Sequence, residues 1–183
     1  MPATVLYLLV IVPPEPVLGQ VWALKQELHH LTGSRNAIRL RPHITLWPPL
    51  HRPATFAQEV YPVLSAFAAQ QKEFAVTLRN FDWFENRTLF VRVETKIILQ
   101  EFNARLSKWC RDKGVEIPPE KRPFTPHMTL ATRDLPADQI NTLRQLFAAR
   151  VYSATFPVAG LTLFRHSGTA WEIAAEFSLT PQN

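Results

Sequence analysis

Two short segments of the sequence carry the same order of residue types, and both hold side chains capable of acid–base chemistry. The first reads Pro-His-Ile-Thr-Leu over residues 42–46, and the second reads Pro-His-Met-Thr-Leu over residues 126–130. Imidazole has a pKa of about 6.5, so a histidine can accept or donate a proton near neutral pH. A threonine hydroxyl can donate a hydrogen bond to developing negative charge. The two segments therefore suit an anion that needs proton transfer, such as a phosphate ester.

The spacing within each segment predicts a strand with one polar face. Alternate side chains of a strand point to the same side of the sheet, so His43 and Thr45 share a face. The second segment repeats this arrangement. The alternation of apolar and polar residues extends over 38–47 in the first copy and over 124–132 in the second. Each copy is therefore predicted to be a half-buried strand.

Two such strands facing each other predict an acid–base mechanism that needs no metal or other cofactor. One neutral imidazole can take a proton from attacking water, and one imidazolium can donate a proton to the leaving oxygen. The catalytic candidates are His43, Thr45, His127 and Thr129. The substrate-binding candidates are Arg41, Trp47, Arg122 and Arg133, of which Trp47 could either wall the site or fill the core. The sequence has neither the carboxylate cluster of a two-metal phosphatase nor histidines at the spacing of a metal site.

The composition indicates one globular unit with a mild excess of positive charge. The chain has 183 residues, which we interpret as one domain over residues 1–183. The formal net charge of +5 is compatible with an anionic substrate such as RNA or a nucleotide. The sequence has no dense run of lysine and arginine, so charge alone does not identify a nucleic-acid-binding protein.

Several features predict a cytoplasmic protein without a membrane segment. The single Cys110 cannot form an internal disulfide and is expected to be a small core residue, which fits a reducing compartment. The apolar run over residues 4–12 is too short to span a membrane and lacks a basic signal-peptide flank, so we expect a buried strand. No heptad pattern argues for self-association, and we expect a monomer.

The remaining periodicity predicts helices and strands in a regular order. Helices are expected over 14–33, 56–67, 98–109 and 136–147, with Asp134 as the cap of the last; further strands are expected over 4–12, 74–78, 89–93, 155–164 and 170–179. Pro48 and Pro49 are expected to close the first motif strand, and residues 81–87 to form a hairpin loop. Trp83 and Phe84 in that loop could stack on a base or pack over the sheet. This order predicts an α+β fold with two lobes facing each other across a cleft.

The two motifs, their flanks and the order of elements resemble the 2H phosphoesterase superfamily. The segments His-Ile-Thr-Leu and His-Met-Thr-Leu match its paired motifs, and Arg122-Pro123-Phe124 is similar to the lead-in before its second motif. Within it, the chain is most similar to the 2'-5' RNA ligase-like group, which includes the bacterial RNA 2',3'-cyclic phosphodiesterases. The resemblance implies a bilobal fold of two antiparallel-sheet lobes with helices outside, pseudo-twofold symmetry and an active-site cleft between the lobes.

The resemblance also implies roles for individual residues. The two His–Thr pairs would be the catalytic pairs, with His43 protonating the 3'-oxygen leaving group and His127 activating water to leave a 2'-phosphate. The family often has a basic residue five positions after the second histidine. This chain has Thr132 there, and Arg133 is one position further on.

These inferences predict a metal-independent hydrolase that converts an RNA or nucleotide 2',3'-cyclic phosphate into a 2'-phosphate. One alternative is 2'-5' RNA ligation, which is the same chemistry in reverse. Another is a nucleotide- or RNA-binding module without turnover, and a third is a metal-dependent phosphatase. Substitution of either histidine and addition of a chelator distinguish these possibilities.

Overall fold

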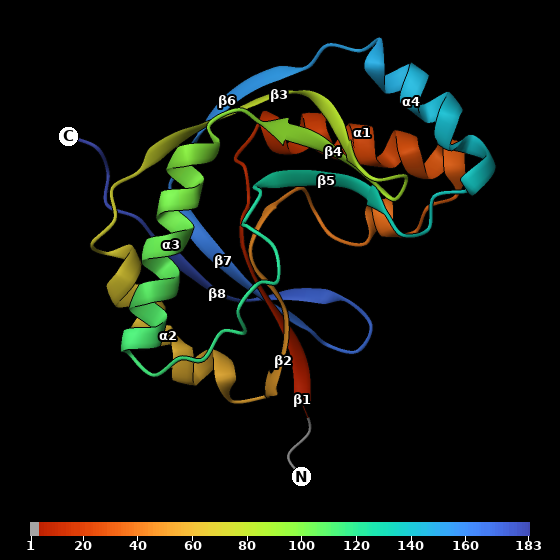
Figure 1. The fold of residues 1–183 in the computed structure, drawn as a ribbon. Coiled ribbons are helices and arrows are strands. Elements are labelled where there is room, and N and C mark those ends of the chain that lie inside the picture. Colours follow the sequence, from red (N-terminus) through yellow and green to blue (C-terminus); the bar gives the residue numbers. More distant parts are fainter. Residues whose placement is uncertain (1–3) are drawn as a thin grey trace.

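The computed structural model describes residues 4–183 and is built around one antiparallel sheet (Figure 1). The strands within these residues are β1 (Thr4–Ile11), β2 (Ile44–Pro53), β3 (Phe74–Phe84), β4 (Thr88–Val93), β5 (His127–Thr132), β6 (Ser153–Val158), β7 (Gly160–His166) and β8 (Trp171–Ser178). They lie side by side in the order β6-β3-β4-β5-β2-β1-β7-β8. The two strands that carry the histidine motifs, β2 and β5, are therefore neighbours in the middle of the sheet.

Helices cover the sheet in two groups. The helices of the described chain are α1 (Val17–Thr32), η1 (Asn36–Ile38), α2 (Phe56–Ala68), α3 (Lys96–Asp112), η2 (Ala137–Gln139) and α4 (Ile140–Ala148). Figure 1 shows α1 and α4 beside the half that holds β3, β4 and β5, and α2 and α3 together near β7 and β8. Consistent with this view, α1 packs against β5, and α2 packs against α3 and β8.

A narrow contact joins the two halves of the sheet. The pairing of β2 with β5 consists of one residue pair, Ile44 and Met128, and both side chains are fully buried. The predicted mixture of helices with an antiparallel sheet is confirmed. The sequence predicted a separate sheet for each lobe, whereas the structure joins both halves in one sheet through this pair. The division into two lobes stays a prediction.

The inner face of α1 illustrates how the local sequence produces the fold and where the prediction was wrong. The helix ends as predicted at Gly33, whose φ of 73° lies in the left-handed region that glycine tolerates. The helical spacing of apolar residues predicts that Leu24 and Leu31 also face the core, but Leu31 is 50% exposed. The buried stripe instead runs through Val17, Val21, Lys25 and Leu28. A lysine thus occupies a core-facing position.

Both motif strands begin later than the alternation of the sequence predicted. Strand β2 starts at Ile44 and β5 at His127, so Arg41 precedes the first strand. Strand β2 also continues past Pro48 and Pro49, which were expected to end it. The pairing with β1 shifts register there, and the far side of β2 pairs with β5 only at Ile44. Proline is tolerated at such an irregular, half-paired position because no ladder hydrogen bond is lost.

The segment predicted as one strand over 155–164 is two strands that serve opposite halves of the sheet. Strand β6 pairs with β3, whereas β7 pairs with β1 and β8. The break falls between Val158 and Gly160. A Cβ atom on Gly160 would lie 2.7 Å from the carbonyl oxygen of Phe177, so glycine permits the close approach of β8 at this crossing.

Three further expectations are corrected by the packing. Strand β3 continues to Phe84, so only residues 85–87 remain in the hairpin loop. Helix α3 buries Leu99 and Cys110, whereas Ile98, which helical spacing with Phe102 and Leu106 predicts to be buried, is 43% exposed. Cys110 is a core residue as predicted, and burial raises the pKa of its thiol to about 12. Asp134 does not cap α4; its carboxylate accepts hydrogen bonds from residues 34–36, at the start of η1.

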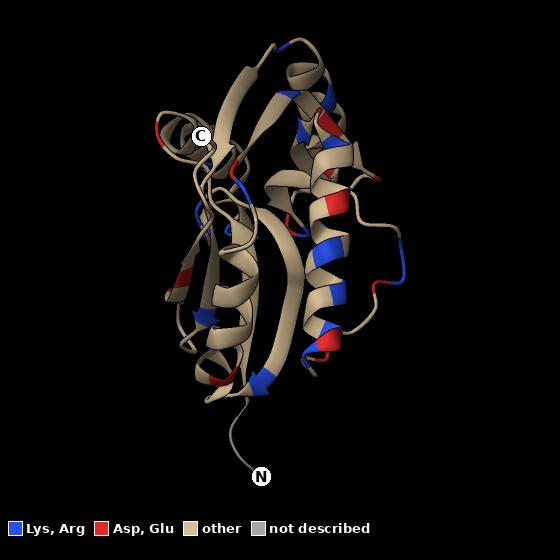
Figure 2. Ribbon diagram, turned by 90° about the vertical axis from the view of Figure 1, so that its left-hand side faces the viewer, with Lys and Arg blue, Asp and Glu red and all other residues tan. Residues whose placement is uncertain are grey.

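Basic and acidic residues are mixed along the helices of the described chain. Figure 2 shows basic and acidic positions interspersed along helices of the molecule. The four ion pairs found within residues 4–183 involve residues on β3, β7, α1 and α3. In that described part of the chain, no helix has the length and hydrophobicity needed to cross a membrane.

The junction between the halves should be a major contributor to stability. Met128→Ala removes a fully buried side chain at the β2–β5 contact and should lower the free energy of unfolding by about 2–5 kcal/mol. Ile98→Ala, on the exposed side of α3, should change it by less than about 1 kcal/mol. Urea unfolding followed by circular dichroism measures both. Equal losses for the two variants would contradict the assignment of Met128 to the core of the junction.

Candidate active site

The register of β2 and β5 brings the two motifs together. Ile44 pairs with Met128 in an antiparallel sense. One residue on either side of that pair, a regular continuation of this register would set His43 opposite Thr129 and Thr45 opposite His127. Directly opposed residues of a regular antiparallel pair have Cβ atoms about 4.5–5.5 Å apart. The four side chains share the face opposite to Ile44 and Met128, because successive residues of a strand alternate between faces.

Each histidine is held by the same backbone hydrogen bond. The Nδ1 atom of His43 lies 2.7 Å from the carbonyl oxygen of Arg41, and Nδ1 of His127 lies 2.7 Å from that of Thr125. A carbonyl only accepts hydrogen bonds, so Nδ1 carries the proton in both rings. In the neutral imidazole, Nε2 then has the free lone pair. Both histidines are thereby prepared to accept a proton at Nε2.

The proline of each motif explains why this hydrogen bond occurs twice. Residue 41 precedes Pro42, and residue 125 precedes Pro126. The residue before a proline is restricted to extended conformations, which limits the direction of its carbonyl group. Both prolines are buried, so the backbone before each histidine is also fixed by packing. The duplicated proline thus helps set the tautomer of the duplicated histidine.

The four motif residues line one cavity, which we call the histidine cavity. Its volume is about 650 Å³, and its lining comes from β1, β2, β3, β4, β5, β8, α1 and the segments that follow α1 and β5. The charged or titratable residues of the lining are Lys25, Arg39, His43, His51, His127 and Arg133. None of the lining residues within the described chain is an aspartate or a glutamate. The cavity therefore favours an anion.

Burial keeps both catalytic candidates uncharged in the free protein. Burial lowers the pKa of His43 to about 4, against the opposing effect of its hydrogen bond to Arg41, and the positive charges of Lys25 and His127 lower it further. Burial also lowers the pKa of His127, and its hydrogen bond to Thr125 acts in the opposite direction. Neutral imidazoles at Nε2 are the form that a general base requires.

Aromatic rings support His127 from the side of the β3–β4 hairpin. The ring of Phe84 contacts His127 edge to face with centroids 4.8 Å apart, and Phe90 lies 5.3 Å away. Of the two hairpin aromatics singled out from the sequence, Phe84 thus lies at the histidine cavity and packs on His127. Trp83 instead lies beneath the guanidinium of Arg144, at 4.9 Å.

The predicted substrate-binding residues separate into two groups. Arg133 lines the histidine cavity, and Arg122 and Arg133 both line an adjoining cavity of about 670 Å³ that also includes Thr45 and His127. The guanidinium of Arg41 lies 5.7 Å from the ring centroid of Phe164 and is absent from both linings. Because β2 starts only at Ile44, the strand alternation that placed Arg41 beside His43 does not apply. Its carbonyl group, rather than its charge, contributes to the site.

Trp47 does not reach the histidine cavity, and its predicted substrate contact is not supported. The side chain is 1% exposed and belongs to the core. It lines a different cavity of about 720 Å³, between β2 and the loop after α3. The pairing with β1 shifts register between Thr45 and Trp47, so the two residues do not share a face as the alternation predicted.

Comparison with known proteins assigns the chain to a family. The sequence profile of the 2'-5' RNA ligase superfamily matches residues 13–170, which is most of the chain. The chain belongs to the 2'-5' RNA ligase superfamily. A protein named RNA 2',3'-cyclic phosphodiesterase, from Thermus thermophilus, is 26% identical over 177 residues, covering 91% of this chain and 86% of that protein.

Solved structures share the fold of this superfamily member. The protein TT0787 of Thermus thermophilus superposes with a TM-score of 0.67 at 22% identity, over 97% of this chain and 100% of that one. Escherichia coli LigT complexed with 3'-AMP superposes with a TM-score of 0.66 at 16% identity, over 97% and 99%. Both likenesses cover 97% of this chain, which confirms the predicted fold class.

Three other residues at the histidine cavity were hard to foresee from the sequence. Lys25 lines the histidine cavity from α1, and the Oγ1 atoms of Thr88 and Thr132 lie 2.6 Å apart at its edge. Lys25 was detectable as a lysine three residues before Leu28 and four after Val21, on an otherwise apolar stripe. Thr132 was noted only as a departure from the family pattern. Thr88 had no signal, because its position depends on the pairing of β4 with β5.

Neighbouring loops are tied together around the histidine cavity. The carboxylate of Asp134 accepts hydrogen bonds from the hydroxyl of Ser34 and from the N–H groups of Arg35 and Asn36. The side-chain amide of Asn36 donates to the carbonyl of Thr132 at 3.0 Å. These contacts join the segment after α1 to the segment after β5, and so fix the backbone next to Arg133.

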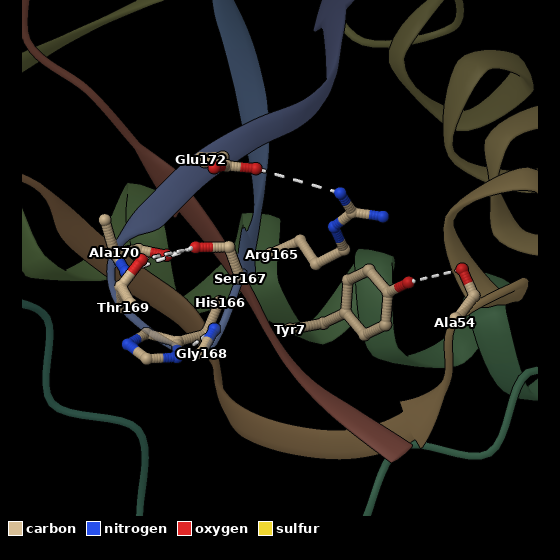
Figure 3. A network of polar contacts seen from close by, with 9 residues as sticks. All are labelled: Tyr7, Ala54, Arg165, His166, Ser167, Gly168, Thr169, Ala170 and Glu172. Atoms are coloured by element: carbon tan, nitrogen blue, oxygen red, sulfur yellow. Dashed lines mark hydrogen bonds and ion pairs between the residues drawn. The ribbon is translucent and has the colours of Figure 1, made fainter. Parts of the chain in front are cut away.

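A hairpin at the end of the sheet supplies the last wall of the cavity. In Figure 3, Ser167 and Ala170 close the turn between β7 and β8, and Arg165 forms an ion pair with Glu172 at 3.7 Å. This turn places Trp171 at the start of β8, where it lines the histidine cavity. His166 packs edge to face on Trp171 and does not itself line the cavity.

No group of three or more histidine, cysteine, aspartate or glutamate side chains suited to a metal ion occurs within residues 4–183. The candidate site consists of two histidines and two threonines, with the cationic side chains of Lys25, Arg39 and Arg133 around them.

The low histidine pKa values predict loss of stability in weak acid. The unfolded chain protonates His43 near pH 6.5, whereas the folded chain does so only near pH 4. The unfolded state thus binds more protons between these values, and the free energy of unfolding should fall as pH decreases from about 6.5 to 4. Urea unfolding at pH 7, 5.5 and 4.5 measures this fall.

His43→Gln provides the test of the cause. It removes the titrating group, so the free energy of unfolding should fall less with pH than in the wild type. His30→Gln, on the exposed side of α1, is the matched control and should follow the wild type. A pH dependence that is identical in all three proteins would contradict the assignment of this effect to His43.

Proposed function

We propose that this superfamily member is a phosphodiesterase that hydrolyses the 2',3'-cyclic phosphate of RNA or a nucleotide to a 2'-phosphate by two-histidine acid–base catalysis. One observation carries the proposal: both histidines and both threonines line a single cavity beside the Ile44–Met128 contact of the two motif strands. The name of the Thermus thermophilus relative supports the substrate class. The complex of Escherichia coli LigT with 3'-AMP supports a nucleotide as ligand.

The electrostatics of the histidine cavity fit this substrate. Lys25, Arg39 and Arg133 line it without a carboxylate among the described lining residues. A phosphodiester carries one negative charge, which this surround attracts, and charges in a partly buried site are screened less by salt than those on the surface. The threonine hydroxyls can then donate hydrogen bonds to the non-bridging oxygens as negative charge develops.

The mechanism requires two proton transfers. Nε2 of one histidine takes a proton from water as the water oxygen bonds to phosphorus. The bond between phosphorus and the 3'-oxygen breaks, and that oxygen receives a proton from Nε2 of the other histidine. The products are a 2'-phosphate and a 3'-hydroxyl. The negative charge of the bound phosphate favours the imidazolium form that the acid needs, and so offsets the effect of burial on its pKa.

The division of roles between the histidines is open to direct test. The family resemblance assigns the acid to His43 and the base to His127. In this chain, the positive charge of Lys25 disfavours a protonated His43, which favours the opposite assignment. The two assignments predict different outcomes for a substrate whose leaving group needs no proton.

The proposal predicts that both histidines are required for hydrolysis. We expect wild-type protein to convert cyclic 2',3'-AMP and an oligoribonucleotide with a cyclic-phosphate end into 2'-phosphates in the presence of EDTA. His43→Ala and His127→Ala should each reduce kcat by about 10²–10⁴-fold, because each removes one proton transfer. His30→Ala should retain activity. Chromatography against 2'- and 3'-phosphate standards identifies the product.

Other outcomes discriminate the alternatives. Activity that survives both substitutions would place the site elsewhere, and activity lost on adding EDTA would indicate a metal-dependent phosphatase. Binding of nucleotide without turnover would indicate a binding module, and joining of RNA ends would indicate 2'-5' ligation. With a p-nitrophenyl phosphodiester, the variant that lacks the acid should recover most of its activity, and the variant that lacks the base should not.

A further inference from the structure

Lys25 is a buried cation in the wall of the histidine cavity. It lies on the inner face of α1, and its side chain is 2% exposed, between the fully buried Val21 and Leu28. Its ammonium group donates a hydrogen bond to the backbone carbonyl of Thr129 at 3.2 Å. Thr129 belongs to the second motif, and it lines the histidine cavity together with Lys25 and His43. The lysine therefore touches the backbone of one motif beside the histidine of the other.

The positive charge of Lys25 has no carboxylate partner in the part of the chain that the structure describes. None of the four ion pairs within residues 4–183 includes it. The carboxylates of neighbouring segments are engaged elsewhere: Glu27 pairs with Arg150, and Asp134 accepts hydrogen bonds from residues 34–36. The other charged or titratable groups facing the same cavity are Arg39, His43, His51, His127 and Arg133.

An unpaired buried ammonium is costly to the folded protein. Moving such an ion out of water costs several kcal/mol, unless an opposite charge and further hydrogen bonds compensate for the loss. Burial accordingly lowers the pKa of Lys25 to about 8, which leaves the group mostly protonated at neutral pH. An ammonium has three N–H donors, and a single acceptor for it is found among the described residues. Within the described residues the ammonium therefore has an uncompensated charge and unused N–H donors, both of which a bound anion would satisfy.

We propose that Lys25 is an anion-binding residue of the active site, and that its ammonium supplies the buried positive charge that holds the substrate's phosphate between the two His–Thr pairs. The Thr129 carbonyl anchors the ammonium in the wall of the cavity. The phosphate accepts its remaining hydrogen bonds and balances its charge. The identity of the anion rests on the proposed function, whereas binding of inorganic phosphate tests the role of Lys25 without turnover.

A purely structural role for Lys25 predicts the opposite effect on stability. If the lysine served only to anchor β5, its replacement would destabilise the protein. If it serves the anion, replacement by an apolar side chain of similar length removes the cost of burying a charge, and stability is maintained or increased. Loss of function with unchanged or higher stability is the pattern expected of a residue kept for its chemistry.

The experiment compares Lys25→Met with Lys96→Met in the full chain. Lys96 is the exposed first residue of α3 and lines neither cavity of the site, so its substitution removes the same formal charge elsewhere. Binding of inorganic phosphate and of adenosine 2'-monophosphate is followed by NMR. Affinity should fall about 10- to 100-fold in Lys25→Met, the range expected for a hydrogen bond to a charged group, and stay within about twofold in Lys96→Met.

Two further readouts separate charge from structure. Thermal unfolding of Lys25→Met should occur at the same temperature as wild type or higher. NMR titration of the ring protons should show a raised pKa for His43 in Lys25→Met, because a nearby positive charge is removed, and no change in Lys96→Met. Lys25→Gln keeps a donor for the Thr129 carbonyl without the charge. Lys25→Gln should lose phosphate affinity in the same way. It replaces Lys25→Met in the binding test if the methionine variant does not fold.

The outcomes are decisive and distinguishable from failure of the proposed function. Unchanged phosphate affinity in Lys25→Met and Lys25→Gln, or a wild type that does not bind phosphate or the nucleotide, would overturn the role of Lys25. If affinity depends on Lys25 but the wild type does not hydrolyse cyclic phosphates, the anion site stands and the assigned reaction is wrong. If the wild type hydrolyses cyclic phosphates and phosphate affinity is unchanged in the Lys25 variants, the assigned reaction stands and this inference is wrong.

Discussion

The antiparallel contact between Ile44 and Met128 is the constraint on which the rest of the site depends. Both side chains are buried in the core, and their pairing is the link between two four-stranded halves of the sheet. A shift of one residue at this contact would turn the motif residues of one strand to the opposite face. Tight packing at the junction therefore does more than stabilise the fold. It also fixes the relative position of the two histidine motifs.

The second physical theme is an excess of positive charge where charge is costly. Two uncharged histidines, two threonines and a buried lysine share a cavity whose described lining has no carboxylate. Such an arrangement is unfavourable for the empty protein and favourable once an anion is present. The same anion would raise the proton affinity of a buried imidazole, so binding and acid–base chemistry are coupled. The proposed mechanism and the proposed role of Lys25 follow from this one electrostatic feature.

The sequence was most informative where local pattern decides the structure. The duplicated His-x-Thr segments, the end of α1 at Gly33 and the core position of Cys110 were all predictable from spacing and residue type. The predictions were wrong where tertiary pairing decides. The irregular segment before β2 removed Arg41 from the polar face, and the register shift between Thr45 and Trp47 accompanies the burial of Trp47 in the core.

Other site residues lay beyond sequence reasoning for a similar reason. Lys25 is 104 positions from Thr129, and Thr88 is 44 positions from Thr132, so neither contact leaves a local pattern. A lysine in an apolar helical stripe is a usable signal, because such a position is costly unless it has a purpose. Membership in the 2'-5' RNA ligase superfamily places the chain among related folds. The tautomer of His43 and His127 and the positive charge around them follow from the structure of this chain.

The central claim is that the two motif strands hold one phosphate between them. A crystal structure with adenosine 2'-monophosphate tests it most directly. We predict that the phosphate lies in the histidine cavity, with oxygens within hydrogen-bonding distance of Nε2 of both His43 and His127. A nucleotide bound instead in the cavity beside Trp47, or a phosphate that contacts only one of the two histidines, would contradict the account.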